Sequence, residues 1–73
     1  ATWCGPCKVF KPVMNEIAGE GYHVEFIDID NLSDLANKYN VRSVPTTVIE
    51  ENGIEVDRIV GSVPKQQVLD KLL

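Results

Sequence analysis

The two cysteines of this chain, Cys4 and Cys7, are the residues best suited to chemistry, and they lie three positions apart. If their segment is helical, side chains at positions i and i+3 share a face and can alternate between two thiols and one disulfide. Pro6 suits the first turn of a helix, where its missing N–H is no loss, and Gly5 lets the backbone turn tightly. The spacing therefore predicts a redox-active dithiol at the start of a helix.

The expected position of Cys4 at a helix N-terminus makes it the more reactive thiol. Unpaired N–H groups and the positive end of the helix dipole favour its thiolate, and Lys8 adds a nearby cation. Cys7 lies one turn further into the helix, where we expect it to be more shielded. Cys4 would then attack a substrate disulfide, and Cys7 would resolve the mixed disulfide by attacking Cys4.

Two other uses of a cysteine pair fit this sequence less well. A structural zinc site needs four ligands, and only His23 could add a further nitrogen or sulfur donor. A static disulfide across so short a loop would constrain the unfolded chain little. We therefore predict no bound metal, and a redox role of the kind indicated by Cys-x-x-Cys beside a βαβ pattern.

Several segments of the sequence resemble the thioredoxin family. The resemblance is carried by Ala1-Thr2-Trp3-Cys4-Gly5-Pro6-Cys7-Lys8, Pro12, Val44-Pro45-Thr46 and Gly61. It runs over the whole chain, and the Gly-Pro between the cysteines is specific, because glutaredoxins and disulfide isomerases usually carry other residues there. The resemblance implies a thioredoxin-like α/β fold that reduces protein disulfides. It also implies no bound cofactor and an electron donor of the thioredoxin-reductase type.

The resemblance further implies a surface around Cys4 where substrate proteins dock. Thioredoxins have a cis-proline at the position of Pro45, which would turn the Val44 N–H and C=O outward to pair with an extended substrate segment. The residues expected to complete this surface are small or apolar: Trp3, Gly5, Pro6, Val60 and Gly61. Such a surface admits many partners, so we expect specificity to come from access to the disulfide more than from a pocket.

The segment that follows the cysteines is predicted to be helical. From Cys7 to about Ala18, apolar residues recur at helical spacing, so one face of the segment is suited to a core. Pro12 is expected to bend this helix, because it leaves the Lys8 carbonyl without its usual partner. Thioredoxins similarly have a bent active-site helix.

The remaining elements are predicted from periodicity and turn residues. The segment 24–30 has β-branched and aromatic residues on both faces, which is typical of a strand inside a parallel sheet. Asn52-Gly53 favours a tight primed turn, because both positions need positive φ, and so predicts a β-hairpin. In chain order we expect helix, strand, helix, hairpin and helix, at residues 7–18, 24–30, 32–39, 46–60 and after Pro64.

One element of the thioredoxin fold has no counterpart in this sequence. In thioredoxins a central strand leads into the Cys-x-x-Cys helix, but only residues 1–3 precede Cys4 here. Strand 24–30 and the hairpin should pair on either side of it, so its absence would leave two open edges and an uncovered core. We therefore expect an N-terminally truncated fold: a piece of a longer chain, an altered chain, or one completed by another chain. A family acid in that strand is also missing, and we assign its role to neither Asp28 nor Asp30.

Length and charge limit the function classes. With 73 residues we expect a single domain over 1–73, near the size at which one core barely stabilises a fold. A formal net charge of −4 argues against nucleic acid, whose binding needs clustered Lys and Arg. Apolar stretches are too short for a membrane helix and no signal peptide precedes the motif, so we expect a cytoplasmic protein without a membrane partner.

Two alternatives to a reductase stay open. An oxidising or isomerising role is the nearer one, since only the family resemblance of the Gly-Pro pair argues against it. A different class is a binding module or accessory subunit, in which the same apolar surface docks a protein without turnover.

Overall fold

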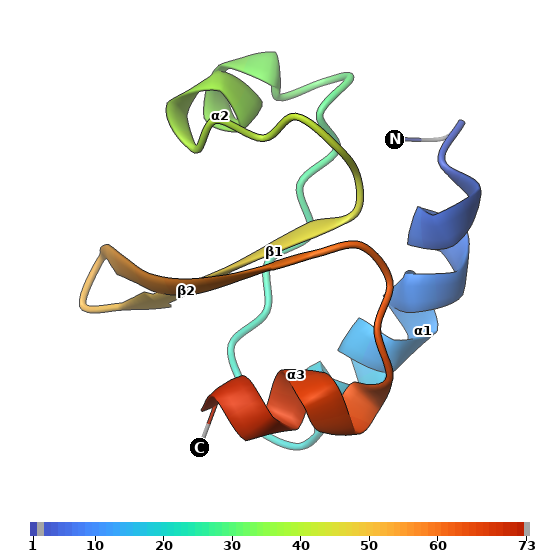
Figure 1. Ribbon diagram of the computed structural model, residues 1–73, viewed down its shortest axis with the longest axis vertical. Coiled ribbons are helices and arrows are strands. Elements are labelled where there is room, and N and C mark those ends of the chain that lie inside the picture. Colours follow the sequence, from blue (N-terminus) through green and yellow to red (C-terminus); the bar gives the residue numbers. More distant parts are fainter. Residues whose placement is uncertain (2, 73) are drawn as a thin grey trace.

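The computed structural model describes Ala1 and residues 3–72. Over these residues the elements are α1 (Gly5–Gly19), α2 (Ser33–Lys38), β1 (Thr46–Glu51), β2 (Ile54–Val60) and α3 (Lys65–Leu72). Figure 1 shows the β1–β2 hairpin across the middle of the molecule, with α2 above it, α3 below it and α1 at the right. The described helices and the hairpin follow the predicted order.

Helix α1 starts where the sequence predicts and provides much of the core. Cys4 is its N-cap, and a proline occupies its first turn. Its apolar spacing places Phe10, Met14 and Ile17 on a buried face. The helix continues through Pro12 to Gly19.

The core joins α1 to the hairpin and to α3. Its buried members are apolar side chains from these elements: Phe10, Met14, Ile17, Ile49, Ile59 and Val68. At its edge Lys65 of α3 forms ion pairs with Glu16 of α1 and with Glu20, the C-cap of that helix, at 3.7 and 3.2 Å. Burial of apolar area at roughly 25 cal/mol per Å² makes this small cluster the main stabilising contact between the elements.

The β-hairpin forms as predicted. Its strands are antiparallel, with Thr46 opposite Val60 and a register shift between Ile49 and Glu50. Asn52 and Gly53 at the turn have φ values of 54° and 80°, the left-handed region that primed turns require.

Residues 24–30 do not form the strand that the sequence predicts, so this prediction is wrong. Within the described part of the chain, no backbone hydrogen bond involves residues 22–27, and β1 pairs with β2 alone. A strand exists only through its partner, and the neighbour that the thioredoxin resemblance places here is not in this sequence. The segment therefore forms no strand in spite of its β propensity.

A wide groove runs along residues 22–29, which include the segment without strand pairing. We call it the core groove: a cavity of about 950 Å³ between α1, residues 22–29 and β1. Five of the six core residues line it, all except Ile59. Along it Phe26 and Ile27 are 48% and 40% exposed. The core is thus open on one side, as expected from the missing strand.

Candidate active site

Cys4 and Cys7 form a disulfide across the first turn of α1, with their Cα atoms 5.3 Å apart. Cys4 has an extended backbone, as an N-cap residue should, and its Sγ accepts a hydrogen bond of 3.1 Å from the Cys7 N–H. That N–H is one of the donors left unpaired at a helix start. The donor and the helix dipole would both stabilise a Cys4 thiolate once the disulfide is reduced.

The shielding of the two cysteines is the reverse of the sequence expectation. Cys4 is only 3% exposed, whereas Cys7 is half-buried. Cys7 lines the core groove together with Phe10 and Met14 of the same helix. Its greater exposure therefore arises from the open side of the core, which the sequence argument from helix position did not consider.

The loop before β1 lies beside the end of β2. The Val44–Pro45 peptide bond is cis. The Gly61 N–H donates to the Pro45 C=O over 2.7 Å, and the Thr46 hydroxyl donates to the Ser43 C=O over 2.6 Å. Gly61 has a φ of 92°, which glycine adopts without strain. Neither the N–H nor the C=O of Val44 has a backbone partner among the residues that the structure describes.

Trp3 is held in place by a carboxylate to which the sequence analysis gave no role. The Trp3 indole N–H donates to Asp30 over 3.2 Å, although the ring is 65% exposed. Asp28 in turn accepts from the Asp30 N–H over 3.0 Å and lies 3.5 Å from the amino group of Ala1. The turn at residues 28–31 thus fixes the residue immediately before Cys4.

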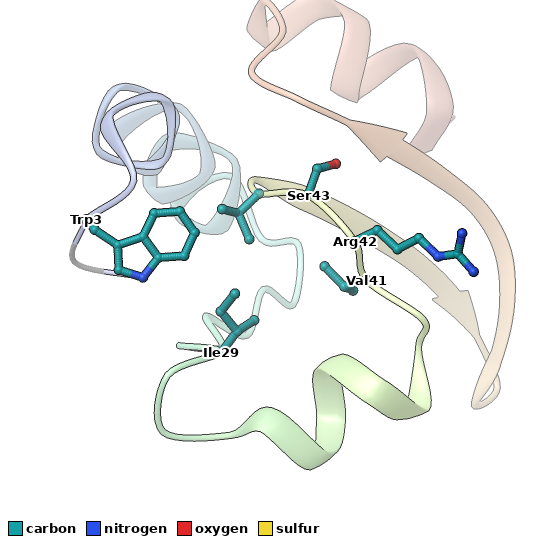
Figure 2. A pocket seen from close by; sticks show the side chains of 6 residues that line it. Trp3, Ile29, Val41, Arg42 and Ser43 are labelled. Carbon is teal, nitrogen blue, oxygen red and sulfur yellow. The ribbon is translucent and has the colours of Figure 1, made fainter.

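A hollow of about 330 Å³ lies between this turn and the loop before Pro45. We call it the Trp3 hollow, and it is lined by Trp3, Ile29, Val41, Arg42, Ser43 and Val44. Figure 2 shows Trp3 and Ile29 on one side and residues 41–43 on the other. The sequence analysis named only two of these residues and expected no pocket. A signal was present, because Val41, Arg42 and Ser43 directly precede Val44-Pro45.

Three other residues named from the sequence lie in the first turn of α1. Gly5, Pro6 and Lys8 are exposed there, and the Lys8 N–H donates to the Cys4 C=O over 3.3 Å. His23 contacts the Glu25 carboxylate over 3.1 Å and is far from buried. In Ala1 and residues 3–72, no three His, Cys, Asp or Glu side chains gather as a metal site would require.

Comparison with known proteins assigns the chain to a family. The family model for thioredoxin matches residues 1–73. This chain belongs to the thioredoxin family. A thioredoxin H-type of Fagopyrum esculentum is 45% identical over 74 residues, covering 99% of this chain and 63% of that protein. A thioredoxin of Mycoplasma genitalium is 40% identical over 72 residues, covering 96% of this chain and 71% of that one.

Solved thioredoxins share the fold. A crystal structure of a thioredoxin of Nicotiana alata matches with a TM-score of 0.86 and 42% identity, covering 99% of this chain and 64% of that one. The thioredoxin-like α/β fold predicted from the sequence is confirmed. The chain spans less than two thirds of the Fagopyrum and Nicotiana proteins. None of its described helices has the length and apolar character needed to cross a membrane.

Proposed function

We propose that this thioredoxin-family chain is a thiol-disulfide oxidoreductase that reduces disulfides in proteins. The observation that supports it most is the Cys4–Cys7 pair at the start of α1, with the Cys7 N–H directed at Cys4 Sγ. A donor and a helix N-terminus both favour the thiolate, which is the form that attacks a disulfide. The two cysteines themselves supply the two electrons to the substrate disulfide and regain them when the electron donor reduces the pair, so the cycle needs no bound cofactor.

The proposed cycle consists of two thiol-disulfide exchanges. The Cys4 thiolate attacks one substrate sulfur, forms a Cys4–substrate disulfide and releases the other substrate sulfur, which takes a proton from water. Cys7, after losing its proton, attacks Cys4 Sγ, so that the Cys4–Cys7 disulfide forms and the second substrate thiol leaves. A partner of the thioredoxin-reductase type would return the two electrons.

We propose that substrates dock as extended segments around Cys4. The Val44 N–H and C=O, unpaired among the described residues, are available to such a segment as an added strand. Trp3 and Val60 offer apolar surface at 65% and 63% exposure. The rest of the proposed surface consists of Gly5, Pro6, Pro45 and Gly61, with Lys8 and Pro12 supporting the helix start.

A binding module that docks proteins without turnover is the second candidate, and one observation favours it. In the disulfide state Cys4 is only 3% exposed, whereas a reactive cysteine is ordinarily at least partly exposed. Such a module would use the same apolar surface but would not depend on Cys4 thiol chemistry.

Separate replacement of each cysteine by serine tests both candidates. The assay is a single turnover of the pre-reduced chain with a disulfide-linked peptide. Cys4→Ser should reduce the peptide no faster than buffer alone, whereas Cys7→Ser should accumulate a Cys4–peptide disulfide visible by mass spectrometry. Unchanged reduction by Cys4→Ser would overturn the reductase. A mixed disulfide trapped on Cys7 in Cys4→Ser would assign the nucleophile to the other cysteine.

The reduction potential of the pair separates a reductase from an oxidising or isomerising enzyme. We expect about −270 mV, a value taken from thioredoxin itself, on equilibration in dithiothreitol buffers followed by alkylation. A value of about −180 mV would instead fit a disulfide isomerase.

We also propose that residues 1–73 act as one domain in the cytoplasm. The single core cluster that joins α1, the hairpin and α3 supports one domain. A reductase works where thiols are kept reduced, which favours the cytoplasm. The net charge of −4 supports protein partners over nucleic acid.

A further inference from the structure

The Trp3 hollow lies directly beside the proposed substrate path. Trp3 precedes Cys4 in the chain, and Val44 precedes Pro45, so both of these lining residues adjoin the proposed docking surface. A volume of about 330 Å³ lies near the lower end of the range of small-ligand sites, about 300 to 1,000 Å³. The hollow is therefore large enough for one bulky side chain of a docked segment.

Most of the walls of the hollow are apolar, and a hydrogen bond positions its aromatic wall. Ile29, Val41 and Val44 contribute aliphatic surface, and the Trp3 ring contributes an aromatic wall. The hydrogen bond from Trp3 to Asp30 holds that ring to the opposite turn. A wall that is already positioned loses less conformational entropy on binding, which favours a specific occupant.

Arg42 is the one charged residue that lines the hollow. Figure 2 shows its guanidinium pointing away from Trp3, so that the aliphatic stem borders the hollow and the charge lies beyond it. Arg58, the other arginine, forms an ion pair with Glu55 at 2.8 Å, whereas Arg42 has no ion pair within the described residues. An unpaired cation on a chain of net charge −4 is complementary to an acidic group on a partner.

We propose that the Trp3 hollow and Arg42 select protein disulfides whose cysteine is flanked by a large apolar residue and, two positions further, an acidic residue. This selection rests on the proposed reductase function. In an extended segment, residues i and i+2 point to the same side. A segment paired with Val44 can therefore place residue i in the hollow and residue i+2 over the Arg42 guanidinium. Arg42 is a specificity-determining residue in this arrangement.

The test is a series of short peptides, each with one cysteine in a mixed disulfide with 2-nitro-5-thiobenzoate, whose release is followed by absorbance. Each peptide carries a leucine near the cysteine, and Asp, Asn or Lys two positions beyond that leucine. In one set of peptides this pair precedes the cysteine, and in a second set it follows the cysteine. At low salt we expect the reduced chain to prefer Asp over Lys by about threefold in kcat/KM, the size of an exposed ion pair. The preference should vanish at about 1 M salt, where charges are screened within about 3 Å.

Three variants assign the preference to Arg42. Arg42→Gln should abolish it and Arg42→Glu should reverse it, while Lys38→Gln should keep it. Lys38→Gln is the matched control, because it removes the same charge from an exposed site in α2, away from the hollow. Replacing the peptide leucine by alanine should lower kcat/KM by about tenfold, as expected when a buried leucine is lost.

The outcomes separate this selection from the reductase function itself. Reduction of all peptides at one rate, or equal effects of Arg42→Gln and Lys38→Gln, overturns the selection and leaves the reductase standing. An Asp preference that survives in Arg42→Glu also overturns it. If the reduced chain releases thiobenzoate from no peptide, the proposed function fails, and the selection that rests on it fails too.

Discussion

The active-site turn and the core groove both adjoin α1, but they differ in how far their backbone polar groups are hydrogen-bonded. At the turn, Cys4 Sγ accepts from the Cys7 N–H, and nearby the Gly61 N–H donates to the Pro45 C=O. Along the groove, residues 22–27 make no backbone hydrogen bond within the part of the chain described. A helix start can be completed by residues a few positions away, whereas the middle of a sheet needs a partner strand.

The same comparison predicts where stability is vulnerable. The groove side holds nearly all of the buried apolar side chains, but one face of that core is open. The turn holds few buried groups and depends on backbone geometry. Changes on the groove side should therefore alter the free energy of unfolding most, and changes at the turn should act through strain and positioning.

Ile17→Ala should have the largest effect on stability. Ile17 is fully buried in α1, and truncating such a residue removes about 2–5 kcal/mol from the free energy of unfolding. Because a chain of this size has a small total stability, we expect a substantial fraction of the variant to be unfolded even without urea. Urea denaturation followed by circular dichroism measures the change.

Val9→Ala in the same helix is the matched control, because Val9 is 69% exposed. It should shift the free energy of unfolding by less than about 0.5 kcal/mol. If both variants lose the same amount, the groove side does not carry the stability and the contrast between the two regions is wrong.

Gly61→Ala tests the backbone geometry of the active-site side. An added Cβ would meet no atom within 4 Å, but the φ of 92° is unfavourable for alanine, and we expect a loss of about 1–2 kcal/mol. Gly19→Ala is the control, since its Cβ is equally free and its φ is not positive. That change should stabilise the chain by about 0.5–1 kcal/mol in urea denaturation. Equal effects of the two variants would show that φ at Gly61 imposes no constraint.

The sequence predicts well those features that depend on neighbours in the chain. The cap at Cys4, the buried face of α1 and the Asn52-Gly53 turn each arise within a few residues, and all three are present. Residues 24–30 show the limit, because their composition favours a strand but the pairing depends on residues elsewhere.

Much of the candidate site was missed for a similar reason. The Trp3 hollow forms where the turn at 28–31 meets the loop at 41–44, and no local pattern relates these segments. The bond between Trp3 and Asp30 spans 27 positions. The exposure of Cys7 likewise depends on the open groove and not on its place in the helix.

Asp30→Ala should loosen Trp3 without unfolding the chain. Losing an exposed hydrogen bond of this kind changes stability by about 0.5–1.5 kcal/mol at most. Because Trp3 is the sole tryptophan, its fluorescence emission reports the change directly. Asp30→Asn retains an acceptor oxygen and should keep the native emission. If it shifts the emission as far as Asp30→Ala does, the charge of Asp30 and not its hydrogen bond positions the ring.

The smallest expected effect concerns the ion-paired carboxylates of β2, Glu55 and Asp57, which should make stability fall at acidic pH. Two Arg58 nitrogens donate to both Glu55 carboxylate oxygens over 2.8 Å, which lowers the pKa of Glu55 below its usual 4.5. A hydrogen bond from Lys71 similarly lowers the pKa of Asp57.

A carboxylate whose pKa is lower in the folded state stabilises the fold above its unfolded pKa, and this contribution is lost as pH falls through the folded pKa. The urea midpoint should therefore decrease between about pH 5 and about pH 3, and Glu55→Gln should make that decrease shallower. Both ion pairs are solvent-exposed, so about 1 M salt should also make the acid-induced decrease in the urea midpoint smaller. An identical acid profile in Glu55→Gln would show that the Arg58 pair adds no stability. The hairpin would then depend on its turn and on the core side chains it shares with the groove.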